Sequence, residues 1–348
     1  MKSDKPDDQE LNDNEQPIDS GRKPMKLGRW LILALLLIAL GPYLYSRVLA
    51  PHRRVQLFDN SDHAQIERAF EGELSIVSFN IAHGRGTASS NWTEAGQPKR
   101  ERIAAIAEKI KQIDADVVVL NEVDFNSTWS GGQNQAAAIA SAASYRYHVE
   151  QRNLDFGFVY GSFNFGNAIL SHYPIVDAQQ IDFPPEKNWE DWLVGCKRGA
   201  LASVQLTPDK TIRVGAIHLE HRSETVRAAG ADLLLKLNDT DAANRLILAG
   251  DFNSTPFGFP QTRQPKETSN ALDLIFESQA FHCYPESNPQ ANDFTFSTMQ
   301  PKSVIDWIMV SRQANQGQPS PFTQYRVVDT TLSDHRLLHA AIKLVQEP

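Results

Sequence analysis

The chain has 348 residues, of which 41% are hydrophobic and 22% are charged. A chain of this size and composition folds into one large or two ordinary globular domains with a sizeable core. Its net charge of −8 argues against a protein held on nucleic acid by a broad basic surface. It leaves room for a metal enzyme that acts on phosphates, because there the cation supplies the positive charge.

The N-terminal part divides into a polar tail and an apolar segment. Residues 1–26 are rich in Asp, Asn, Gln and Pro, which predicts a disordered tail. Residues 27–49 follow a basic cluster and are mostly apolar, which predicts a transmembrane signal-anchor helix with Trp30 near one interface. The slight excess of basic residues before this helix favours a cytosolic N-terminus. We therefore expect a single-pass membrane protein whose large C-terminal part is extracytoplasmic.

Two other interpretations of the apolar segment stay open. One is a cleaved signal peptide with Val48 and Ala50 at the cleavage site, although Pro51 and the long leader argue against cleavage. The other is a buried core helix, which the adjacent basic residues disfavour. The two cysteines, Cys196 and Cys283, either pair or remain thiols and so do not decide the compartment.

The rest of the chain has the pattern of one α/β domain. Residues 50–72 are expected to be a juxtamembrane linker and residues 73–346 the domain itself, because strands and helices mix there without a repeat. Strands are predicted at 74–80, 116–122, 167–171, 200–206, 212–218, 246–249, 304–310 and 337–344. Helices are predicted at 99–113 and 223–237.

The apolar run Leu246–Ala249 leads directly into Gly250, Asp251 and Asn253. Gly250 is expected to let the backbone leave the sheet. Asp251 and Asn253 are two residues apart and would share one face of an extended chain, which suits a common ligand such as a metal-bound phosphate. Taken alone, the pattern is more ordinary as a turn, since Asp and Asn bond to nearby backbone.

Polar residues also stand where other predicted strands end. Asn80, Glu122 and His218 each close a strand, and Asp334 and His335 share a loop. Strand ends and their loops are where α/β folds assemble sites. Each residue alone has an ordinary explanation, such as a helix cap, a core histidine or a turn aspartate. Together the five segments predict one cleft.

These segments resemble the endonuclease/exonuclease/phosphatase superfamily. The matching stretches occur in family order: "SFNIAHG", "LNEVD", "GNAILSHYPI", "KRGALASV", "AIHLEHRSE", "ILAGDFNS", "VIDWIMVS" and "LSDHRLLHAAI". The resemblance is specific for the superfamily and poor for the subfamily. It implies a deoxyribonuclease I-like two-sheet α/β sandwich with its site at one rim, preceded here by the N-terminal transmembrane helix.

The resemblance assigns a metal role to three residues. Glu122 resembles the principal Mg²⁺ ligand, Asn80 lies beside it, and Asp334 resembles a metal-site or histidine-supporting carboxylate. Mn²⁺ is an alternative ion. Hard oxygen ligands suit Mg²⁺, which keeps several waters and shares the phosphate of its substrate. The sequence has no Cys cluster with zinc spacing.

The resemblance assigns the catalytic steps to four other residues. Asp251 resembles the residue that orients or deprotonates the attacking water. His218 and His335 resemble the pair that contacts the scissile phosphate, and Asp306 resembles the carboxylate that orients His335. Serine nucleophile chemistry has no support, because the sequence has no G-x-S-x-G elbow.

Two phosphate contacts are also implied by the resemblance. Asn253 resembles a donor to a phosphate oxygen, and Arg198, in "KRGAL", is placed to offer a bidentate contact. The carboxylate that supports the first histidine in some members has no evident counterpart here. Glu220, a backbone carbonyl or another group would have to support His218.

The chain departs from two subfamily patterns. It has "GDFNST" where the similar inositide 5-phosphatases have "GDLNYR", which disfavours that activity. It has Asp124 where abasic-site endonucleases commonly carry a lysine, which disfavours a repair role.

Two further stretches have both a functional and a structural interpretation. His221, Arg222 and Arg227 would form a substrate-reading loop or a solvated first helical turn. Trp189 and Trp192 would stack on bases, touch lipid or cover the core.

The expected function is that of a membrane-anchored, Mg²⁺-dependent phosphoesterase that hydrolyses a phosphodiester by direct attack of water. Its substrate would be nucleic acid or a phospholipid. A membrane anchor favours a lipid substrate. The sequence shows no inserted apolar hairpin, which argues against one. The alternatives are a phosphomonoesterase for a small or lipid phosphate and a non-catalytic binding domain with the same fold. The intact set of acidic, amide and histidine residues argues against the latter.

Overall fold

The computed structural model describes most of the chain. The described residues are 27–44, 54–60, 68–94, 96–158, 161–187, 197–240, 245–260, 270–312 and 319–344. The predicted disordered tail therefore lies outside them. The chain divides into two units, Met1–Gly41 and Pro42–Pro348, and both sheets belong to the second.

The apolar N-terminal segment contains the helix α1, Leu27–Leu44, which confirms helical structure within the predicted segment 27–49. Residues 45–49 lie outside the described part of the chain. Large apolar side chains along α1 are exposed, including Trp30 at 54% and Ile38 at 71%. Among the described residues, no helix has both the length and the apolar character to cross a membrane.

Two mixed sheets form the second unit, which confirms the predicted α/β sandwich. The seven-stranded sheet has the order β1-β4-β5-β3-β2-β13-β12 and the six-stranded sheet the order β10-β11-β9-β8-β7-β6. The strands of the first are β1 (Val55–Asp59), β2 (Glu73–Asn80), β3 (Val117–Asp124), β4 (Tyr147–Phe158), β5 (Gly161–Ser171), β12 (Phe322–Val328) and β13 (Leu337–Lys343). Those of the second are β6 (Ile175–Asp182), β7 (Arg198–Thr207), β8 (Lys210–His218), β9 (Arg245–Asp251), β10 (Phe281–His282) and β11 (Asp306–Ser311).

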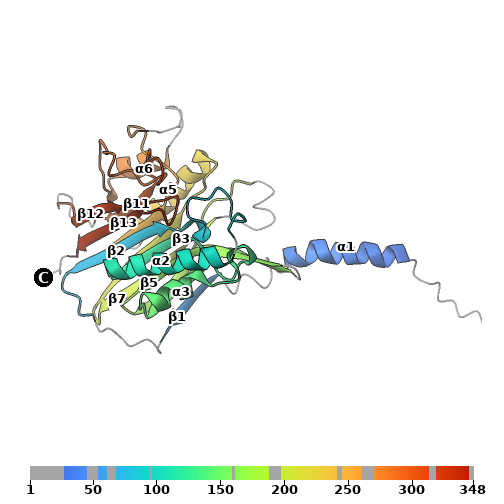
Figure 1. Cartoon of the computed structure of the whole chain (residues 1–348). Helices are drawn as coiled ribbons and strands as arrows, with labels where there is room; N and C mark the ends of the chain where they lie inside the picture. The colour runs from blue at the N-terminus through green and yellow to red at the C-terminus, as the bar shows by residue number, and fades with distance from the viewer. Residues whose placement is uncertain are drawn as a thin grey trace, which may run out of the picture. The chain divides into compact units, whose positions relative to one another are not determined.

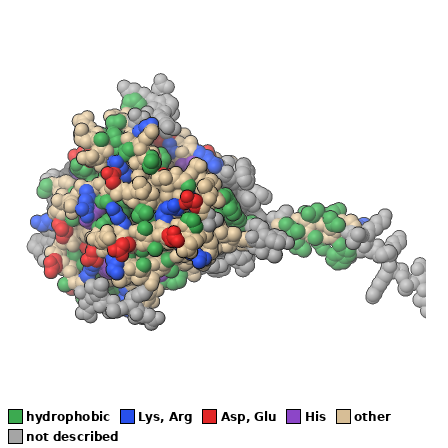
Figure 2. Space-filling view, in the orientation of Figure 1, with side chains coloured by type: hydrophobic (Ala, Val, Ile, Leu, Met, Phe, Trp, Pro, Cys, Tyr) green, Lys and Arg blue, Asp and Glu red, His purple; other side chains and the backbone are tan. Residues whose placement is uncertain are grey.

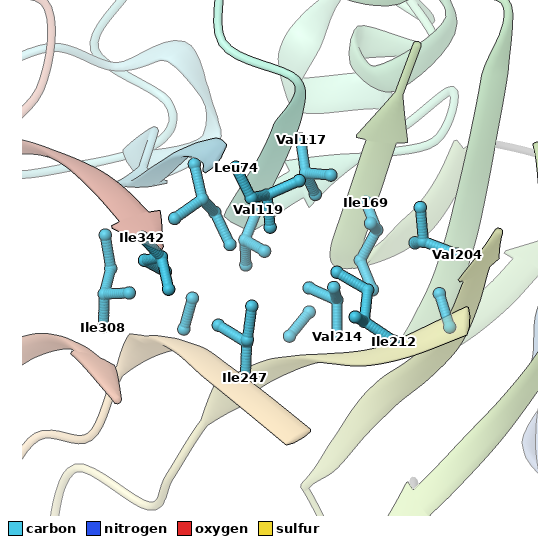
Figure 3. Close-up of a cluster of buried hydrophobic side chains, with 14 of the residues drawn as sticks. Leu74, Val117, Val119, Ile169, Val204, Ile212, Val214, Ile247, Ile308 and Ile342 are labelled. Carbon is cyan, nitrogen blue, oxygen red and sulfur yellow. The ribbon is translucent and has the colours of Figure 1, made fainter. Parts of the chain in front are cut away.

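The inner faces of the sheets enclose one apolar core (Figure 3). Leu74 and Val119 from the first sheet face Val214 and Ile247 from the second, and all four are fully buried. Each such side chain contributes about 1.5–3 kcal/mol on burial. The predicted strands read as nearly continuous apolar runs because both of their faces are covered.

Helices cover the outer face of each sheet. α2 (Gln97–Ile113) and α3 (Gln135–Ala142) pack on the seven-stranded sheet, with which they share a second buried cluster (Figure 1). α5 (Glu224–Thr240) and α6 (Ala271–Ser278) pack on the six-stranded sheet through a third. The stripe that predicted α2, including Ile103 and Ile110, is buried in this way.

The crossovers bring strand ends together at one rim. β2 and β3 are parallel and joined through α2, and β8 and β9 are parallel and joined through α5. Parallel neighbours end at the same edge of a sheet, so the polar residues that close these strands meet there.

The sequence interpretation missed several elements. β1 lies inside the stretch assigned to a linker and pairs with β4. β4, β6, β10, β12, α3 and α6 were not predicted. Several of these strands lie at sheet edges, where one strand face meets solvent and the apolar pattern weakens. β4 and β5 form a long hairpin in which Phe156 pairs with Phe163.

Gly250 does not end β9, contrary to the prediction. The strand runs through Gly250 to Asp251, in parallel register with Ile217 and His218. The φ of Gly250 is +143°, and a Cβ there would lie 1.9 Å from the carbonyl oxygen of Ile217. Only glycine allows β9 to approach β8 this closely and to carry Asp251 to the rim.

Candidate active site

Three neighbouring strands of the six-stranded sheet place His218, Asp251 and Asp306 side by side. His218 on β8 and Asp306 on β11 are both the direct register partners of Asp251 on β9. All three residues are at most 5% exposed. The Nε2 atom of His218 lies 3.8 Å from Asp251 Oδ2. The register of β8, β9 and β11 therefore fixes one half of the site.

His335 joins this half from the loop before β13. Its Nδ1 atom lies 2.9 Å from Asp306 Oδ2, and its Nε2 atom lies 3.8 Å from Asp251 Oδ2. Burial would lower the pKa of His335, but the nearby carboxylates of Asp306 and Asp251 raise it to about 10. The ring is therefore an imidazolium at neutral pH, with Nε2 directed at Asp251.

Asp251 has an unusually high pKa for a carboxyl group. Burial and the charge of Asp306 raise it to about 7, against the opposing effect of His335. Its Oδ1 atom accepts the backbone N–H of Asn253 at 2.8 Å, and its Oδ2 atom accepts Asn80 Nδ2 at 3.1 Å. A fixed carboxyl that titrates near neutrality is suited to accept a proton from water.

His218 has the opposite charge state to His335. Burial and the charge of Lys197 lower its pKa well below the ordinary value for histidine. Glu220 does not serve as its support, because the carboxylate of Glu220 binds the backbone N–H groups of His221 and Arg222. His218 is thus a neutral imidazole beside a protonated one.

The seven-stranded sheet contributes Asn80 from the end of β2 and Glu122 from β3. Asn80 Oδ1 accepts the backbone N–H of Ala82 at 3.0 Å, which directs Nδ2 toward Asp251 and toward Glu122 Oε1 at 3.4 Å. Glu122 has a φ of +52°, and Ala82 and His83 have φ values of +49° and +54°. Non-glycine residues adopt such angles rarely and mostly where function requires them.

Two residues of this half were not assigned roles from the sequence. Arg85 donates from Nη1 to Glu122 Oε2 at 3.1 Å and from Nη2 to Asp334 Oδ2 at 2.6 Å. His83 lies with Nε2 3.3 Å from Glu122 Oε2 and Nδ1 2.8 Å from Asp124 Oδ1. Both follow the strand-ending Asn80 in "NIAHGRG". The signal for them was a histidine and an arginine directly after a strand that ends in the predicted site.

The donor set around Glu122 fits a hard divalent cation. The carboxylates of Glu122 and Asp334 come from separate segments, and the Arg85 guanidinium bridges them. Burial opposes the charge of Glu122, but His83, His218 and Arg85 lower its pKa, so it is ionised. Ser333 Oγ, next to Asp334, donates to the carbonyl oxygen of Asn80 at 2.7 Å and holds this loop at the site. Ionised oxygen ligands of this kind are those that Mg²⁺ prefers.

A second cluster, Asp251, Asp306 and His335, has ligand atoms within 4.8 Å of one another. We assign it to proton chemistry, because the Nδ1 atom of His335 is occupied by Asp306 and the ring is protonated. A protonated imidazole cannot bind a metal ion.

The two predicted phosphate contacts differ in their placement. Asn253 lies at the rim, with a φ of +51° and its Nδ2 atom donating to the carbonyl oxygen of Leu219 at 3.2 Å. Arg198 is 4% exposed. Its Nη1 atom donates to the carbonyl oxygen of Asn153 at 2.7 Å, and its Nε atom to Asp182 Oδ1 at 3.2 Å. These contacts hold the Arg198 guanidinium against β4 and β6.

A buried amide chain links the two halves of the site. Asn121 Oδ1 accepts the backbone N–H of Asp251 at 3.1 Å, and Asn121 Nδ2 donates to the carbonyl oxygen of Ile217 at 3.0 Å. The same Nδ2 donates to Asn167 Oδ1 at 2.7 Å, and Asn167 Nδ2 donates to Gln151 Oε1 at 2.6 Å. Asn121 therefore fixes the position of β9 relative to β3.

The remaining predictions have mixed outcomes. Arg227 is buried and paired with Glu224 at 2.7 Å, so it is a structural residue of α5. The ring of His221 lies 3.0 Å from Glu220, and Arg222 donates from Nε to that ring. Cys283 is a buried free thiol. Three other predicted residues, Trp189, Trp192 and Cys196, lie outside the described residues.

This fold and this cluster define a class of metal-dependent phosphoesterases, and the sequence comparison agrees. The model of the Endonuclease/Exonuclease/phosphatase family matches residues 77–335. The chain belongs to this family, whose members hydrolyse phosphoester bonds and generally use divalent metals.

Two relatives illustrate the range of similarity. An inositol phosphosphingolipids phospholipase C from Schizosaccharomyces pombe is 27% identical over 212 residues, 54% of this chain and 43% of that protein. The uncharacterized protein YbhP of Escherichia coli is 25% identical over 260 residues, 71% of this chain and 90% of that protein. The chain thus spans less than half of the yeast protein.

Solved structures share the fold at lower identity. An endonuclease/exonuclease/phosphatase from Beutenbergia cavernae is similar with a TM-score of 0.56 and 19% identity, over 79% of this chain and 72% of that one. The human Nocturnin catalytic domain with bound sulfate has a TM-score of 0.55 and 16% identity. The match covers 85% of this chain and 99% of that one.

Proposed function

We propose that the chain is a Mg²⁺-dependent phosphodiesterase that hydrolyses its substrate by direct in-line attack of water on phosphorus. The observation that carries this proposal is the convergence of three groups in different charge states. Asp251 lies 3.8 Å from both a neutral His218 and a protonated His335. Such a set can accept one proton and donate another in a single turnover.

Asp251 accepts the proton of the attacking water. Asn80 and the backbone of Asn253 hold its two oxygens, so the carboxyl keeps a fixed direction. His335 donates from Nε2 to the phosphate or to the leaving oxygen, and Asp306 holds the ring by Nδ1. The P–O bond to the leaving group breaks as the bond from water forms, and the leaving oxygen takes a proton.

The neutral His218 and the Asn253 side chain bind phosphate oxygens. A neutral imidazole offers one N–H donor and adds no charge to a site that already holds His335 and Arg85. Glu122 and Asp334, with Asn80 beside them, would hold Mg²⁺, which when bound neutralises charge on the phosphate. Arg85 keeps the two carboxylates at a common distance.

We propose that the N-terminal segment tethers this enzyme to a membrane, with the domain outside the cytosol. The exposed apolar side chains of α1 and the basic residues before them support this. The full-length protein should stay in the membrane fraction after a high-salt wash. Release by salt alone would mean electrostatic, peripheral binding.

The activity is tested on the full-length protein in detergent, with bis(p-nitrophenyl) phosphate as diester and p-nitrophenyl phosphate as monoester. We expect Mg²⁺-dependent cleavage of the diester that EDTA abolishes and His218→Ala reduces at least about a hundredfold. Faster cleavage of the monoester would favour a phosphomonoesterase. Equal rates in the wild type and His218→Ala would reject the mechanism.

A further inference from the structure

Four aromatic side chains form a chain of contacts that starts beside His83, a neighbour of the predicted metal ligand Glu122. We call Trp92, Trp129, Phe163 and Phe165 the aromatic ledge. The inner end of the ledge contacts His83, whose Nε2 atom lies 3.3 Å from Glu122 Oε2. The ring of His83 is 5.1 Å from that of Phe165 and 5.4 Å from that of Trp129. The ledge therefore starts one side chain away from the predicted metal ligand.

The ledge continues from the site to the surface. Trp129 is 5.1 Å from Phe163, and Trp92 is 6.0 Å from each of them. Trp92 is 59% exposed, which is high for a tryptophan that has two aromatic neighbours.

Two hydrogen bonds hold the base of the ledge. Trp129 Nε1 donates to Asp124 Oδ2 at 2.8 Å, and Asp124 Oδ1 binds His83 Nδ1 at 2.8 Å. Phe163 lies on β5 opposite Phe156 of β4, with the two rings 6.2 Å apart. The ledge thus combines the distal end of the β4–β5 hairpin with two loops.

We propose that the aromatic ledge is the surface by which the enzyme docks on the lipid phase that carries its substrate. This inference rests on the proposed phosphodiesterase function and names its substrate class as a phospholipid headgroup. Trp and Phe rings partition to the boundary between acyl chains and headgroups, where one side is apolar and the other is wet. A headgroup phosphate would then face Glu122 while the lipid chains face Trp92.

The ring geometry favours lipid over nucleobases. The three outer rings cross at angles of 67° to 84°, so no two of them are parallel. The three rings pack edge to face, so they offer no pair of parallel faces between which a base would stack. A nucleobase would have only one partly exposed ring on which to stack.

The charges beside the ledge favour the same conclusion. Arg85 is engaged by Glu122 and Asp334. Arg102 is paired with Glu94 at 2.7 Å and donates to the carbonyl oxygen of Gly84. On the face shown in Figure 2, basic and acidic side chains are interspersed. A nucleic-acid track needs a continuous basic stripe.

The test compares lipid and soluble substrates in the full-length protein. One arm uses mixed micelles that contain phosphatidylinositol and sphingomyelin, and the other uses bis(p-nitrophenyl) phosphate. We expect Trp92→Ala to lower the ratio of the lipid rate to the soluble rate at least tenfold, and Trp92→Phe to restore most of it. Tyr284→Ala is the control, because Tyr284 is 41% exposed and follows the edge strand β10.

A second readout does not depend on activity. Micelles that contain lipid with brominated acyl chains quench tryptophan fluorescence on contact. The wild type should lose more fluorescence than Trp92→Phe, and α1 contributes equally in both. No difference between them would overturn the docking role, even if the enzyme cleaves both substrates.

Other results separate the two proposals. Equal losses on lipid and soluble substrates in Trp92→Ala would mean that the ledge only supports the site, and would overturn docking. Selective loss of single-stranded oligonucleotide cleavage would make it a base-stacking surface and would also overturn docking. If the wild type cleaves no phosphodiester, the proposed function fails, and the quenching difference still reports whether the ledge contacts lipid.

Discussion

On the six-stranded sheet, His218, Asp251 and Asp306 lie on three adjacent strands in direct register. On the seven-stranded sheet, only Asn80 and Glu122 come from strands. The other groups of that half, above all Arg85, come from irregular backbone with positive φ values nearby. One half of the site is set by strand pairing and the other by loop conformation.

This difference predicts how each half responds to change. A group set by register cannot move without breaking a sheet, so a mutation there removes one chemical step and leaves the geometry. A group set by a loop depends on its ion pairs, so a mutation there shifts its neighbours too.

The largest effect is expected for Asp251→Asn. The amide keeps the size of the carboxyl but cannot accept the proton of the attacking water, so turnover should fall at least about a hundredfold. The variant should unfold at nearly the same temperature as the wild type. Diester kinetics and thermal melting test this, with the exposed turn residue Asp209→Asn as the matched control. Near-wild-type turnover would remove Asp251 from the mechanism.

Asn121→Leu tests the link between the two halves. The substitution leaves the backbone N–H of Asp251, the carbonyl oxygen of Ile217 and the Oδ1 atom of Asn167 without this partner. Each unsatisfied buried group costs about 1–3 kcal/mol, so the three together predict a loss of at least about 3 kcal/mol in the free energy of unfolding. Denaturant unfolding measures it, with Gln324→Leu on the edge strand β12 as the control. Unchanged stability would show that the halves are held together by apolar packing alone.

Arg85→Gln probes the loop-set half. Without the guanidinium, Glu122 and Asp334 repel each other, and we expect a diester rate about tenfold lower. Mg²⁺ binding, followed by calorimetry, should change as well, because Arg85 competes for the same carboxylates. Arg85→Lys keeps the positive charge but loses the paired contacts of the guanidinium with the two carboxylates. Its diester rate should lie between those of the wild type and Arg85→Gln. An unchanged rate and an unchanged Mg²⁺ affinity would show that Arg85 has no role at the site.

The sequence predicted the site residues that close strands better than those that lie on loops. Apolar runs that end in Asn80, Glu122, His218 and Asp251 show both the strands and the residues that close them. Pairing then follows from the parallel crossovers. Neither the contact of Arg85 with two carboxylates nor the inward direction of His83 could be derived, because both depend on backbone angles that the residue types disfavour.

The same reasoning explains two other differences. Arg198 matched a motif, but its strand position points the guanidinium at Asn153 and Asp182, which the sequence does not reveal. The β4–β5 hairpin was missed because "YHVEQRNLDFGF" mixes charged residues with apolar ones. Those charges are satisfied within the fold, as in the pair Arg152–Glu150 at 3.1 Å. A strand that buries paired charges lacks the apolar sequence pattern from which strands are predicted.

The smallest expected effect concerns the pH dependence of Asp306→Asn. The pKa of His335 is raised to about 10, against the effect of burial, by Asp306 and Asp251. The protonated ring and the ionised carboxyl of Asp251 are the active forms, so kcat/KM should be high between the pKa of Asp251, about 7, and that of His335, and lost above the latter. Replacing Asp306 with an amide removes one raising charge but keeps the contact to Nδ1, so the basic limb should move to lower pH by about one unit.

The direction of this shift distinguishes two roles for Asp306. If the carboxylate stabilises the imidazolium, the limb moves toward neutral pH while the rate at pH 8 changes little. If it only orients the ring, the rate falls equally at every pH and the limb stays in place. Because Asp306 sits in register with Asp251 and its geometry survives the substitution, a moved limb would show that strand pairing sets the charge of His335 from the neighbouring strand.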